Sequence, residues 1–357
     1  MTADTLGGVW TWALDLARAL DDDFDFVIAV MGRRMTADQQ ADARALGNVE
    51  VFSSDYRLEW MPEAWDDVER AGQWLLHLAE QTRPDIVHLN GYVHANLPWK
   101  APVAVMAHSC VLSWWDAVKR APAPREYDRY AREVRAGLRA ADLVAAPSQA
   151  MIEGLERHYG PQPGARVIPN GRDAALYRRG MKEPFLFAAG RLWDEAKNIA
   201  ALQEVAPSLS WPVLVAGDDM HPDGSRRSLD NLCGLGRLAP KQIARWMSRA
   251  PIYALPARYE PFGLSVLEAA LSGCALVLGD ISSLRENWDG AAVFVHPDDT
   301  DRLRASLEVL TRSQDLVNNL AERASERASS FTAKRMARAW RSVYAELLQK
   351  KELLPCA

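Results

Sequence analysis

The chain has 357 residues, of which 25% are charged and 48% hydrophobic, and its formal net charge is −5. This length suggests about two domains, and the composition is that of a globular protein rather than a disordered or fibrous one. The small acidic excess argues against a nucleic-acid-binding face, which usually carries a basic excess. The longest charge-free apolar stretch, Ala101–Trp115, is shorter than the ~20 residues that a membrane-spanning helix needs.

The start of the chain and its cysteines predict a cytoplasmic location. Asp4 and a glycine pair stand where a secretory signal would have its apolar core. Only Met1–Asp4 precede Leu6-Gly7-Gly8, whereas a typical strand has ~5–6 residues; either residues upstream of Met1 are missing or the first strand is short. The cysteines show no paired spacing and are expected to be reduced thiols. They are Cys110, Cys233, Cys274 and Cys356.

Short apolar runs alternate with amphipathic stretches in the first half of the chain. The hydrophobic spacing predicts helices at Trp10–Leu20 and Glu63–Ala79. Apolar strands that alternate with helices are typical of a parallel sheet covered on both faces. The predicted strands are Phe24–Val30, Ile86–Leu89, Val103–Ala107, Leu143–Ala146 and Arg166–Ile168.

The same pattern begins again in the second half. Between the halves lies Pro169–Gly180, with the turn signal Asn170-Gly171. We therefore predict domains at residues 1–172 and 173–330, and a C-terminal helix at 331–357 that packs back on the first domain. The predicted strands of the second half are Phe185–Ala189, Val213–Ala216, Ile252–Leu255, Ala275–Leu278 and Ala292–Val295. Its predicted helices are Pro240–Ser248, Ser265–Ser272 and Thr300–Thr311.

The strongest functional motif is the run EPFGLSVLEAA, which begins at Glu260 directly after a predicted strand. A loop and a helix start at the carboxyl end of a parallel strand are where open α/β sheets bind ligands. The N–H groups of Phe262, Gly263 and Leu264 suit an anion such as a diphosphate. Glu260 and Glu268 suit vicinal hydroxyls because carboxylates are acceptors. Either glutamate alone would be an ordinary surface residue; the combination favours a site.

A second motif, GRLWDEAKN, follows the predicted strand Phe185–Ala189. Arg191 and Lys197 would place two cations at the end of that strand, where they could stabilise the charge on a departing phosphate. Two surface cations six residues apart are, taken alone, a weak signal.

Two weaker signals lie in the first half. Gly7 and Gly8 open the first predicted helix and allow close approach of a phosphate or sugar; they do not form GxGxxG, which makes a nicotinamide or flavin cofactor less expected. His108 directly follows the strand Val103–Ala107 and could hydrogen-bond a sugar. A plain turn and a structural histidine are the alternatives.

Taken together, these elements resemble the retaining glycosyltransferases of family 4, which have the GT-B fold. The resemblance covers nearly the whole chain. Its most specific part is the segment EPFGLSVLE, in which seven residues separate the two glutamates. The segments that carry it, in chain order, are Gly7-Gly8, DIVHLNG (Asp85–Gly91), AHS around His108, APS (Ala146–Ser148), VIPNG (Val167–Gly171), GRLWDEAKN (Gly190–Asn198), EPFGLSVLEA (Glu260–Ala269) and SLRE ending at Glu286.

The resemblance implies an α/β GT-B fold: two Rossmann-like, doubly wound parallel-sheet domains facing a cleft. It implies that the first domain binds the acceptor and the second a nucleotide-diphosphate sugar. Glu260 would contact sugar hydroxyls and Glu268 the ribose, while Arg191 and Lys197 would hold the diphosphate. The other implied contacts are Gly8 to phosphate or sugar, His108 to the donor sugar, and the backbone of Arg237 and Leu238 to the base.

The implied reaction transfers a sugar with retention of configuration by a front-face mechanism, in glycan or glycoconjugate biosynthesis. No cofactor and no metal are expected, because there is no Asp-x-Asp triplet and the cations can replace the metal. A UDP-sugar donor is weakly favoured, and a glycan, lipid-linked or small-molecule acceptor remains open, as does a peripheral contact with the inner membrane face. The alternatives are a non-catalytic sugar-nucleotide-binding protein, a sugar-nucleotide epimerase or a phosphorylase on the same fold.

Overall fold

The computed structural model describes residues 1–5, 7–220 and 224–353. Leu6 and Cys356, which the sequence analysis named, lie outside these residues. The chain forms two compact units. The N-terminal unit comprises Met1–Asp116, Ala121–Gly171 and the segment from Ala333 onward; the C-terminal unit comprises Ala117–Arg120 and Arg172–Thr332.

All paired strands of the N-terminal unit are parallel. They form two hydrogen-bonded groups in the orders β3-β2-β1 and β4-β5-β6-β7. The Asn90 side-chain amide, directly after β4, donates to Thr2 O in β1 at 2.7 Å, so β1 and β4 are neighbours and the combined order is that of a doubly wound fold. The strands are β1 (Thr2–Asp4), β2 (Phe26–Met31), β3 (Val49–Ser53), β4 (Val87–Leu89), β5 (Val103–Met106), β6 (Leu143–Ala146) and β7 (Arg166–Val167).

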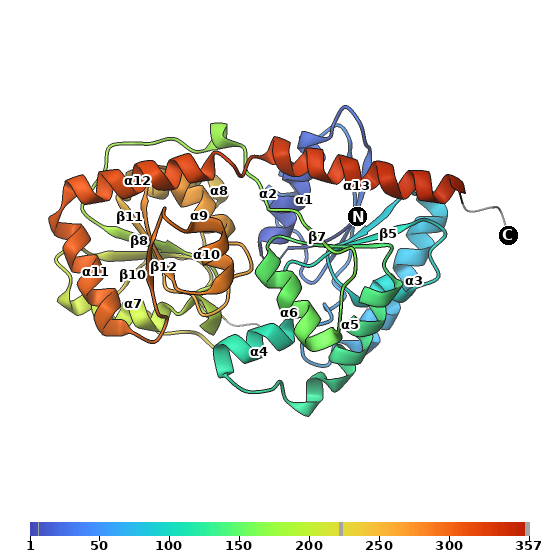
Figure 1. The fold of residues 1–357 in the computed structure, drawn as a ribbon. Helices are drawn as coiled ribbons and strands as arrows, with labels where there is room; N and C mark the ends of the chain where they lie inside the picture. Colours follow the sequence, from blue (N-terminus) through green and yellow to red (C-terminus); the bar gives the residue numbers. More distant parts are fainter. Residues whose placement is uncertain (6, 221–223, 354–357) are drawn as a thin grey trace. The chain divides into compact units, whose positions relative to one another are not determined.

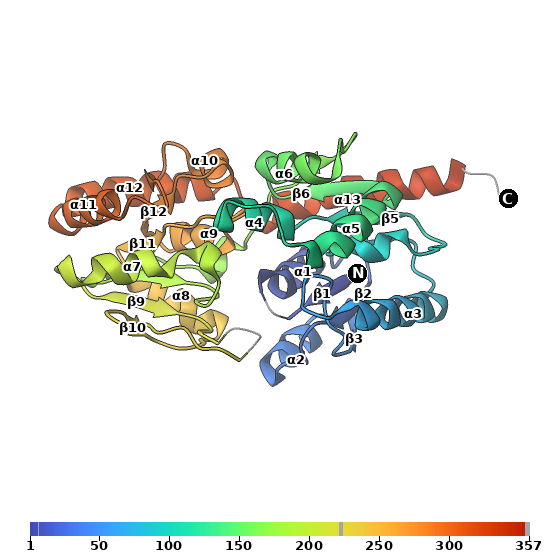
Figure 2. The same ribbon diagram turned by 90° about the horizontal axis from the view of Figure 1, so that it is seen from below.

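Helices cover both faces of this sheet (Figures 1 and 2). Side chains alternate along a strand, so Ala104 and Met106 of β5 pack in one core cluster while Val103 and Val105 pack in another. The helices are α1 (Gly8–Ala19), α2 (Ala37–Arg44), α3 (Trp65–Thr82), η1 (Val93–Asn96), α4 (Val111–Lys119), η2 (Arg125–Tyr127), α5 (Asp128–Ala140), α6 (Gln149–Tyr159) and α13 (Ala333–Leu353).

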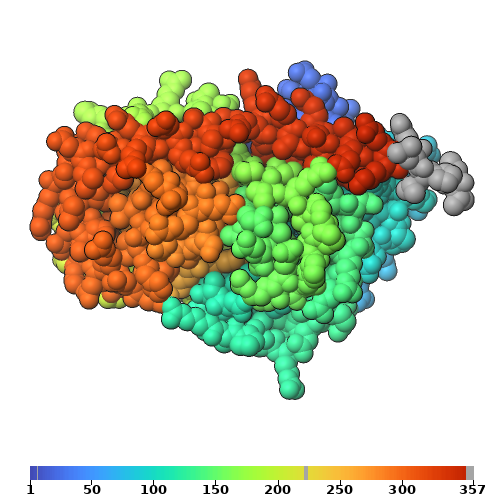
Figure 3. Space-filling view, viewed as in Figure 1, coloured from blue at the N-terminus to red at the C-terminus, as the bar shows by residue number. Residues whose placement is uncertain are grey.

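The C-terminal helix α13 is part of the N-terminal unit. Its buried stripe includes Met336, Trp340, Tyr344 and Leu347, which share one core cluster with α1. The Trp340 ring lies 6.0 Å from that of Trp12. Figure 3 shows α13 (red) lying against the light-green surface of the segment around residue 165. The helix therefore completes the core of a unit whose other elements lie far earlier in the chain.

The C-terminal unit repeats the architecture with one six-stranded, all-parallel sheet in the order β10-β9-β8-β11-β12-β13. Two core clusters fill its two faces. The strands are β8 (Leu186–Ala189), β9 (Val213–Ala216), β10 (Cys233–Gly234), β11 (Ile252–Leu255), β12 (Ala275–Gly279) and β13 (Val293–Val295). The helices are η3 (Ala174–Leu176), η4 (Glu195–Lys197), α7 (Ile199–Val205), η5 (Ala206–Ser208), α8 (Pro240–Arg249), α9 (Leu264–Leu271), α10 (Ser282–Trp288), α11 (Thr300–Arg312) and α12 (Gln314–Ala328).

The predicted GT-B class of fold is confirmed, and the predicted strands lie within two residues of the observed ones. The sequence analysis did not predict β3, whose side chains are only partly buried or exposed, or the two-residue strand β10. β1 is three residues long and pairs with β2 in parallel.

Three of the cysteines, Cys110, Cys233 and Cys274, are free thiols. Within the described part of the chain, no helix is long and apolar enough to cross a membrane.

Candidate active site

The loop after β8 carries the two predicted cations at the carboxyl end of the sheet. The side chain of Lys197 runs over Gly190 in ordinary van der Waals contact, 3.7 Å from where a Cβ would stand. Arg191 donates to Asp194 Oδ2 at 2.7 Å and lies over the ring of Trp193. A short 3-10 turn, η4, then directs Lys197 back across the loop.

Asn198 ends this turn and holds the loop in place. Its backbone is left-handed, with φ 55° and ψ 40°, a conformation that asparagine tolerates better than most residues. Its buried side-chain amide donates to Pro256 O at 2.9 Å and to Pro297 O at 2.7 Å. Because Pro256 follows β11, Asn198 ties the loop after β8 to the loop after β11.

The loop after β11 presents Glu260 at the same edge of the sheet. Glu260 Oε1 accepts the N–H of Gly263 at 3.1 Å, and Glu260 O accepts the Ser283 hydroxyl at 2.6 Å. Gly263 has φ 89° and ψ 65° and directly precedes α9. A left-handed backbone conformation favours glycine, so the glycine at this position allows the chain to turn sharply into α9.

The structure brings two of the predicted residues into direct contact. Lys197 Nζ donates to Glu260 Oε2 at 2.5 Å, with 15% and 12% of the respective side chains exposed. The pair is a nearly buried charge pair that still reaches solvent. Such a pair offers one cation and one acceptor to a ligand at the end of β8 and β11.

Glu268 forms a second ion pair, which the sequence analysis missed. Its partner is Arg172, and the side chains of Arg172 and Glu268 are 5% and 13% exposed. Arg172 comes directly after the predicted turn Asn170-Gly171. An arginine in an irregular segment carries no periodic signal, so only the tertiary structure reveals this contact.

Tyr253 is another buried polar group that sequence reasoning missed. Its hydroxyl donates to Ala189 O at 3.0 Å and lies 2.8 Å from Ser265 Oγ. Burial raises its pKa well above the ordinary value. The neutral phenol therefore fastens the end of β8 to the first turn of α9.

The remaining predicted residues of this unit lie nearby in sequence but differ in environment. Phe262 is buried and packs edge-to-face on Phe331, so its side chain is part of the core. The N–H of Gly263 is already taken by Glu260, and Leu264 starts α9. Arg237 is exposed and Leu238 half-buried, both in the connection between β10 and α8.

In the N-terminal unit, Gly7 and Gly8 are exposed and lead from β1 into α1. His108 follows β5 and packs edge-to-face against Trp12 of α1, with ring centroids 4.8 Å apart. Its Nε2 lies 2.9 Å from Asn90 Oδ1. The structure thus gathers residues that follow three neighbouring strands, β1, β4 and β5, at one edge of this sheet.

The hydrogen bonds of Asn90 fix the form of the His108 ring. The Asn90 amide donates through Nδ2 to Thr2 O at 2.7 Å, so its Oδ1 must be the acceptor of His108 Nε2–H. The ring is half-buried, and its desolvation by the surrounding protein lowers its pKa to about 3. His108 is therefore neutral at pH 7 and offers Nδ1 as an acceptor rather than a second donor.

We expect the His108 ring to remain the neutral Nε2–H tautomer from pH 8 down to pH 5. Long-range proton–nitrogen spectra of protein labelled with ¹⁵N-histidine measure this directly, with His108→Asn to assign the signal. The unfolded chain binds this proton near pH 6.5 and the folded chain only near pH 3, so this group destabilises the fold increasingly as the pH falls between these values. A ring that titrates near pH 6.5 in the folded protein would contradict the assignment.

Glu59 is a half-buried acid near this edge, and nothing in its local sequence pattern singles it out. Its carboxylate accepts the N–H groups of Tyr92 and Val93, each at 3.1 Å, just after β4. Desolvation raises its pKa to about 7, although these hydrogen bonds act in the opposite direction. It anchors the loop between β3 and α3 to the start of η1.

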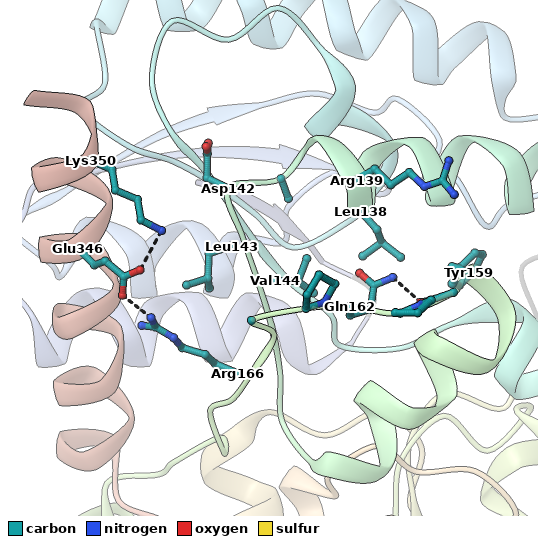
Figure 4. A pocket seen from close by; sticks show the side chains of 15 residues that line it. Leu138, Arg139, Asp142, Leu143, Val144, Tyr159, Gln162, Arg166, Glu346 and Lys350 are labelled. Atoms are coloured by element: carbon teal, nitrogen blue, oxygen red, sulfur yellow. Dashed lines mark hydrogen bonds and ion pairs between the residues drawn. The ribbon is translucent and has the colours of Figure 1, made fainter. Parts of the chain in front are cut away.

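A cavity of about 480 Å³ lies elsewhere in the N-terminal unit (Figure 4). Leu143 and Arg166, which begin β6 and β7, line it together with Glu346 and Lys350 of α13. Arg166 and Lys350 both pair with Glu346. Because the cavity is at the amino ends of parallel strands, it lies at the opposite edge of this sheet from His108. Among the described residues, no cluster of three or more His, Cys, Asp or Glu side chains could hold a metal.

Two family models match this chain, one in each half. Residues 6–176 match the model described as Glycosyltransferase Family 4, and residues 183–313 match that described as Glycosyl transferases group 1. Together with the two doubly wound sheets, these matches show that the chain belongs to the family 4 type of GT-B glycosyltransferases.

Several characterised proteins are similar to it. The glycogen synthase of Mycobacterium tuberculosis is 28% identical over an alignment of 262 residues, which covers 66% of this chain and 62% of that protein. A D-inositol 3-phosphate glycosyltransferase of Nocardioides sp. is 26% identical over 320 residues, covering 74% of this chain and 69% of the other. This chain thus spans about three fifths of the length of the glycogen synthase.

Solved structures share the fold at low sequence identity. The sucrose-phosphate synthase from Thermosynechococcus elongatus superposes with a TM-score of 0.78 at 16% identity, covering 98% of this chain and 99% of the other. HepE of Anabaena, solved in complex with UDP-glucose, superposes with a TM-score of 0.73 at 16% identity, covering 98% and 99%.

Proposed function

We propose that this protein is a retaining hexosyltransferase that moves a sugar from a nucleotide-diphosphate sugar to an acceptor hydroxyl. The observation that supports this proposal most directly is the Lys197–Glu260 pair at the carboxyl edge of the C-terminal sheet. It offers a cation for a phosphate and a carboxylate for sugar hydroxyls side by side. Membership in the glycosyltransferase family supports the same reaction class.

The donor would bind to the C-terminal unit. Lys197 and Arg191 would neutralise the diphosphate, Glu260 would accept hydrogen bonds from the sugar, and Glu268 from the ribose. We favour a UDP-sugar because HepE, whose fold is similar, was solved with UDP and with UDP-glucose. Glycan or glycoconjugate biosynthesis fits the relatives named glycogen synthase and inositol-phosphate glycosyltransferase.

The proposed reaction needs no protein nucleophile. The bond between the anomeric carbon and the diphosphate oxygen breaks, and the acceptor oxygen bonds to that carbon on the same face. The acceptor proton passes to a diphosphate oxygen, so charge and atoms balance. Negative charge grows on the diphosphate in the transition state, and preorganised cations that bind it there lower the barrier.

The acceptor would bind to the N-terminal unit. Gly7, Gly8 and His108 lie at one edge of its sheet, and the family resemblance assigns Gly8 to the phosphate or sugar of the donor and His108 to the donor sugar. His108 Nδ1 would accept a hydrogen bond from a hydroxyl group. A glycan, a lipid-linked sugar and a small polar metabolite are the acceptor classes that we propose to test. The arginines of α5 would be the place to test for a peripheral membrane contact, although Arg129 is paired with Glu69.

A donor screen tests this function. Purified protein is heated with UDP, GDP, ADP and their sugar conjugates, and a ligand at 100 times its dissociation constant should stabilise the fold by ~2.7 kcal/mol. We expect stabilisation by one nucleotide family and release of that nucleoside diphosphate when acceptor is added, with the anomeric configuration retained in the product. Absence of a shift with every nucleotide would overturn the proposal. Change of the donor sugar with no acceptor present would indicate an epimerase instead.

We expect turnover to be unaffected by excess EDTA, because Arg191 and Lys197 can supply the positive charge that a divalent ion supplies elsewhere. The measurement is the rate of nucleotide release before and after chelation and dialysis. A variant with its diphosphate site weakened, Arg191→Ala, should remain equally insensitive to EDTA. Loss of turnover that returns on adding Mg²⁺ or Mn²⁺ would refute metal independence.

A further inference from the structure

Glu268 lies in apolar, largely buried surroundings, where an unpaired charge costs free energy. It is in the middle of α9, whose Val266, Leu267, Ala269 and Ala270 are fully buried. Only 13% of its own side chain is exposed. A carboxylate in such surroundings requires a charged or hydrogen-bonding partner.

Arg172 is held rigidly beside this carboxylate. Its N–H donates to Phe331 O at 3.0 Å, and it forms a parallel β-bridge with Thr332. Arg172, where the chain enters the C-terminal unit, is thus fixed to Phe331 and Thr332, where the chain leaves that unit before α13. The side chain is 5% exposed, and its guanidinium NH2 group binds Glu268 Oε1.

This contact leaves the two oxygens of Glu268 in different states. Oε1 is bound by Arg172, and among the described residues no hydrogen bond to Oε2 is formed. A carboxylate has about four acceptor positions, so one oxygen can anchor the group while the other receives a ligand hydroxyl. An arginine clamp restricts the rotation of the carboxylate, which lowers the entropy cost of binding that ligand.

We propose that Arg172 is a positioning residue for ribose recognition: it orients Glu268 so that Oε2 accepts a hydroxyl of the nucleotide ribose. This inference rests on the proposed function, because it assumes that a nucleoside diphosphate binds at α9. Arg172 itself does not contact the ribose and acts through Glu268. It should therefore affect discrimination between ribose and deoxyribose, which a purely structural arginine would not.

The experiment compares dissociation constants of UDP and 2′-deoxy-UDP by titration calorimetry, with the GDP and ADP pairs as alternatives if the donor screen selects them. The ratio of the two constants measures the hydroxyl contact. A charge-assisted hydrogen bond predicts a ratio of roughly 10–100 in the wild type. We expect the ratio to fall to about 1–3 in both Arg172→Met and Glu268→Gln. The double variant should show no further fall, because residues that act as a unit are not additive.

Two further variants separate positioning from stability. Arg172→Lys keeps the charge but lacks the planar fork, so its ratio should lie between those of the wild type and Glu268→Gln, even if Arg172→Met does not fold. Arg249→Met removes a different arginine of the same unit, one that pairs with Glu183 at 2.6 and 2.7 Å, and it should keep the wild-type ratio.

The outcomes distinguish this inference from the proposed function. If no nucleoside diphosphate binds to the wild type, the proposed function itself fails. If UDP binds but Arg172→Lys and the folded Arg172→Met both keep the wild-type ratio, the positioning role is refuted while the function stands. The role is also refuted if the ratio of dissociation constants falls further in the double variant, by the sum of the two single effects in free energy.

Discussion

Replacing Lys197 by alanine should lower kcat by about 100- to 1000-fold, the loss that typically follows removal of one group that stabilises charge in a transition state. In the proposed reaction the diphosphate gains negative charge as the sugar leaves, and Lys197 is the cation held closest to Glu260 at the ends of β8 and β11. The change also leaves the Glu260 carboxylate, 12% exposed, without its cationic partner. The loss should therefore appear in kcat rather than in KM alone.

Initial rates of nucleoside diphosphate release at varied donor concentration measure this effect. Lys350→Ala is the matched control, because it breaks another Lys–Glu pair, the one with Glu346 at 3.0 Å. That pair lies at the edge of the N-terminal sheet opposite His108. The control should turn over at the wild-type rate. A raised KM with unchanged kcat in Lys197→Ala would mean that the lysine binds substrate and transition state equally, which contradicts its proposed role.

Replacing Trp340 by alanine should destabilise the N-terminal unit by about 3–5 kcal/mol, the range for truncating a large buried aromatic side chain. Trp340 is fully buried, and its ring lies 4.2 Å from that of His88 and 6.0 Å from that of Trp12. The cavity would open between α13 and the elements that it covers. Because the protein has two units, a single unfolding free energy is not well defined.

Hydrogen exchange read by mass spectrometry resolves the two units separately. Peptides from α1 and β2 should exchange faster by a factor of roughly 100 or more in Trp340→Ala, since each 1.4 kcal/mol is tenfold, while peptides from β11 and β12 should keep their protection. Arg338→Ala, an exposed residue of the same helix, should leave both sets unchanged. Unaltered exchange in α1 of the tryptophan variant would show that α13 is not required to complete this core.

Some features of the fold could be predicted from local pattern because local chemistry determines them. The buried strands β5, β6, β9 and β11 are short apolar runs, and the observed bounds agree with those predicted to within one residue. The stripe of α13 follows helical spacing and is buried as expected. The half-buried strand β3 escaped prediction because its alternation is weak, VEVFS, and its burial depends on neighbours outside the segment.

The candidate site shows the same division. The residue types and spacing of Glu260, Glu268, Arg191 and Lys197 were readable from the sequence, because glycine and proline mark the loops and apolar runs mark the strands before them. The contacts that these residues make with one another and with other residues were not readable from the sequence. Arg172 lies 96 positions from Glu268, and nothing within either segment indicates the contact. In the sequence, Tyr253 resembles any other apolar strand residue, although its hydroxyl joins the end of β8 to the first turn of α9.

By itself, then, the sequence determined the alternation of strands and helices that is typical of parallel α/β sheets, the positions of most strands and which loops carry polar chemistry, since these depend on periodicity and on turn residues nearby in the chain. Only the tertiary structure decided which charge pairs with which, that His108 is neutral and fixed as one tautomer, and which core residues of the N-terminal unit α13 packs against. These features depend on desolvation and on contacts between distant segments, and neither is encoded in any local window of the chain.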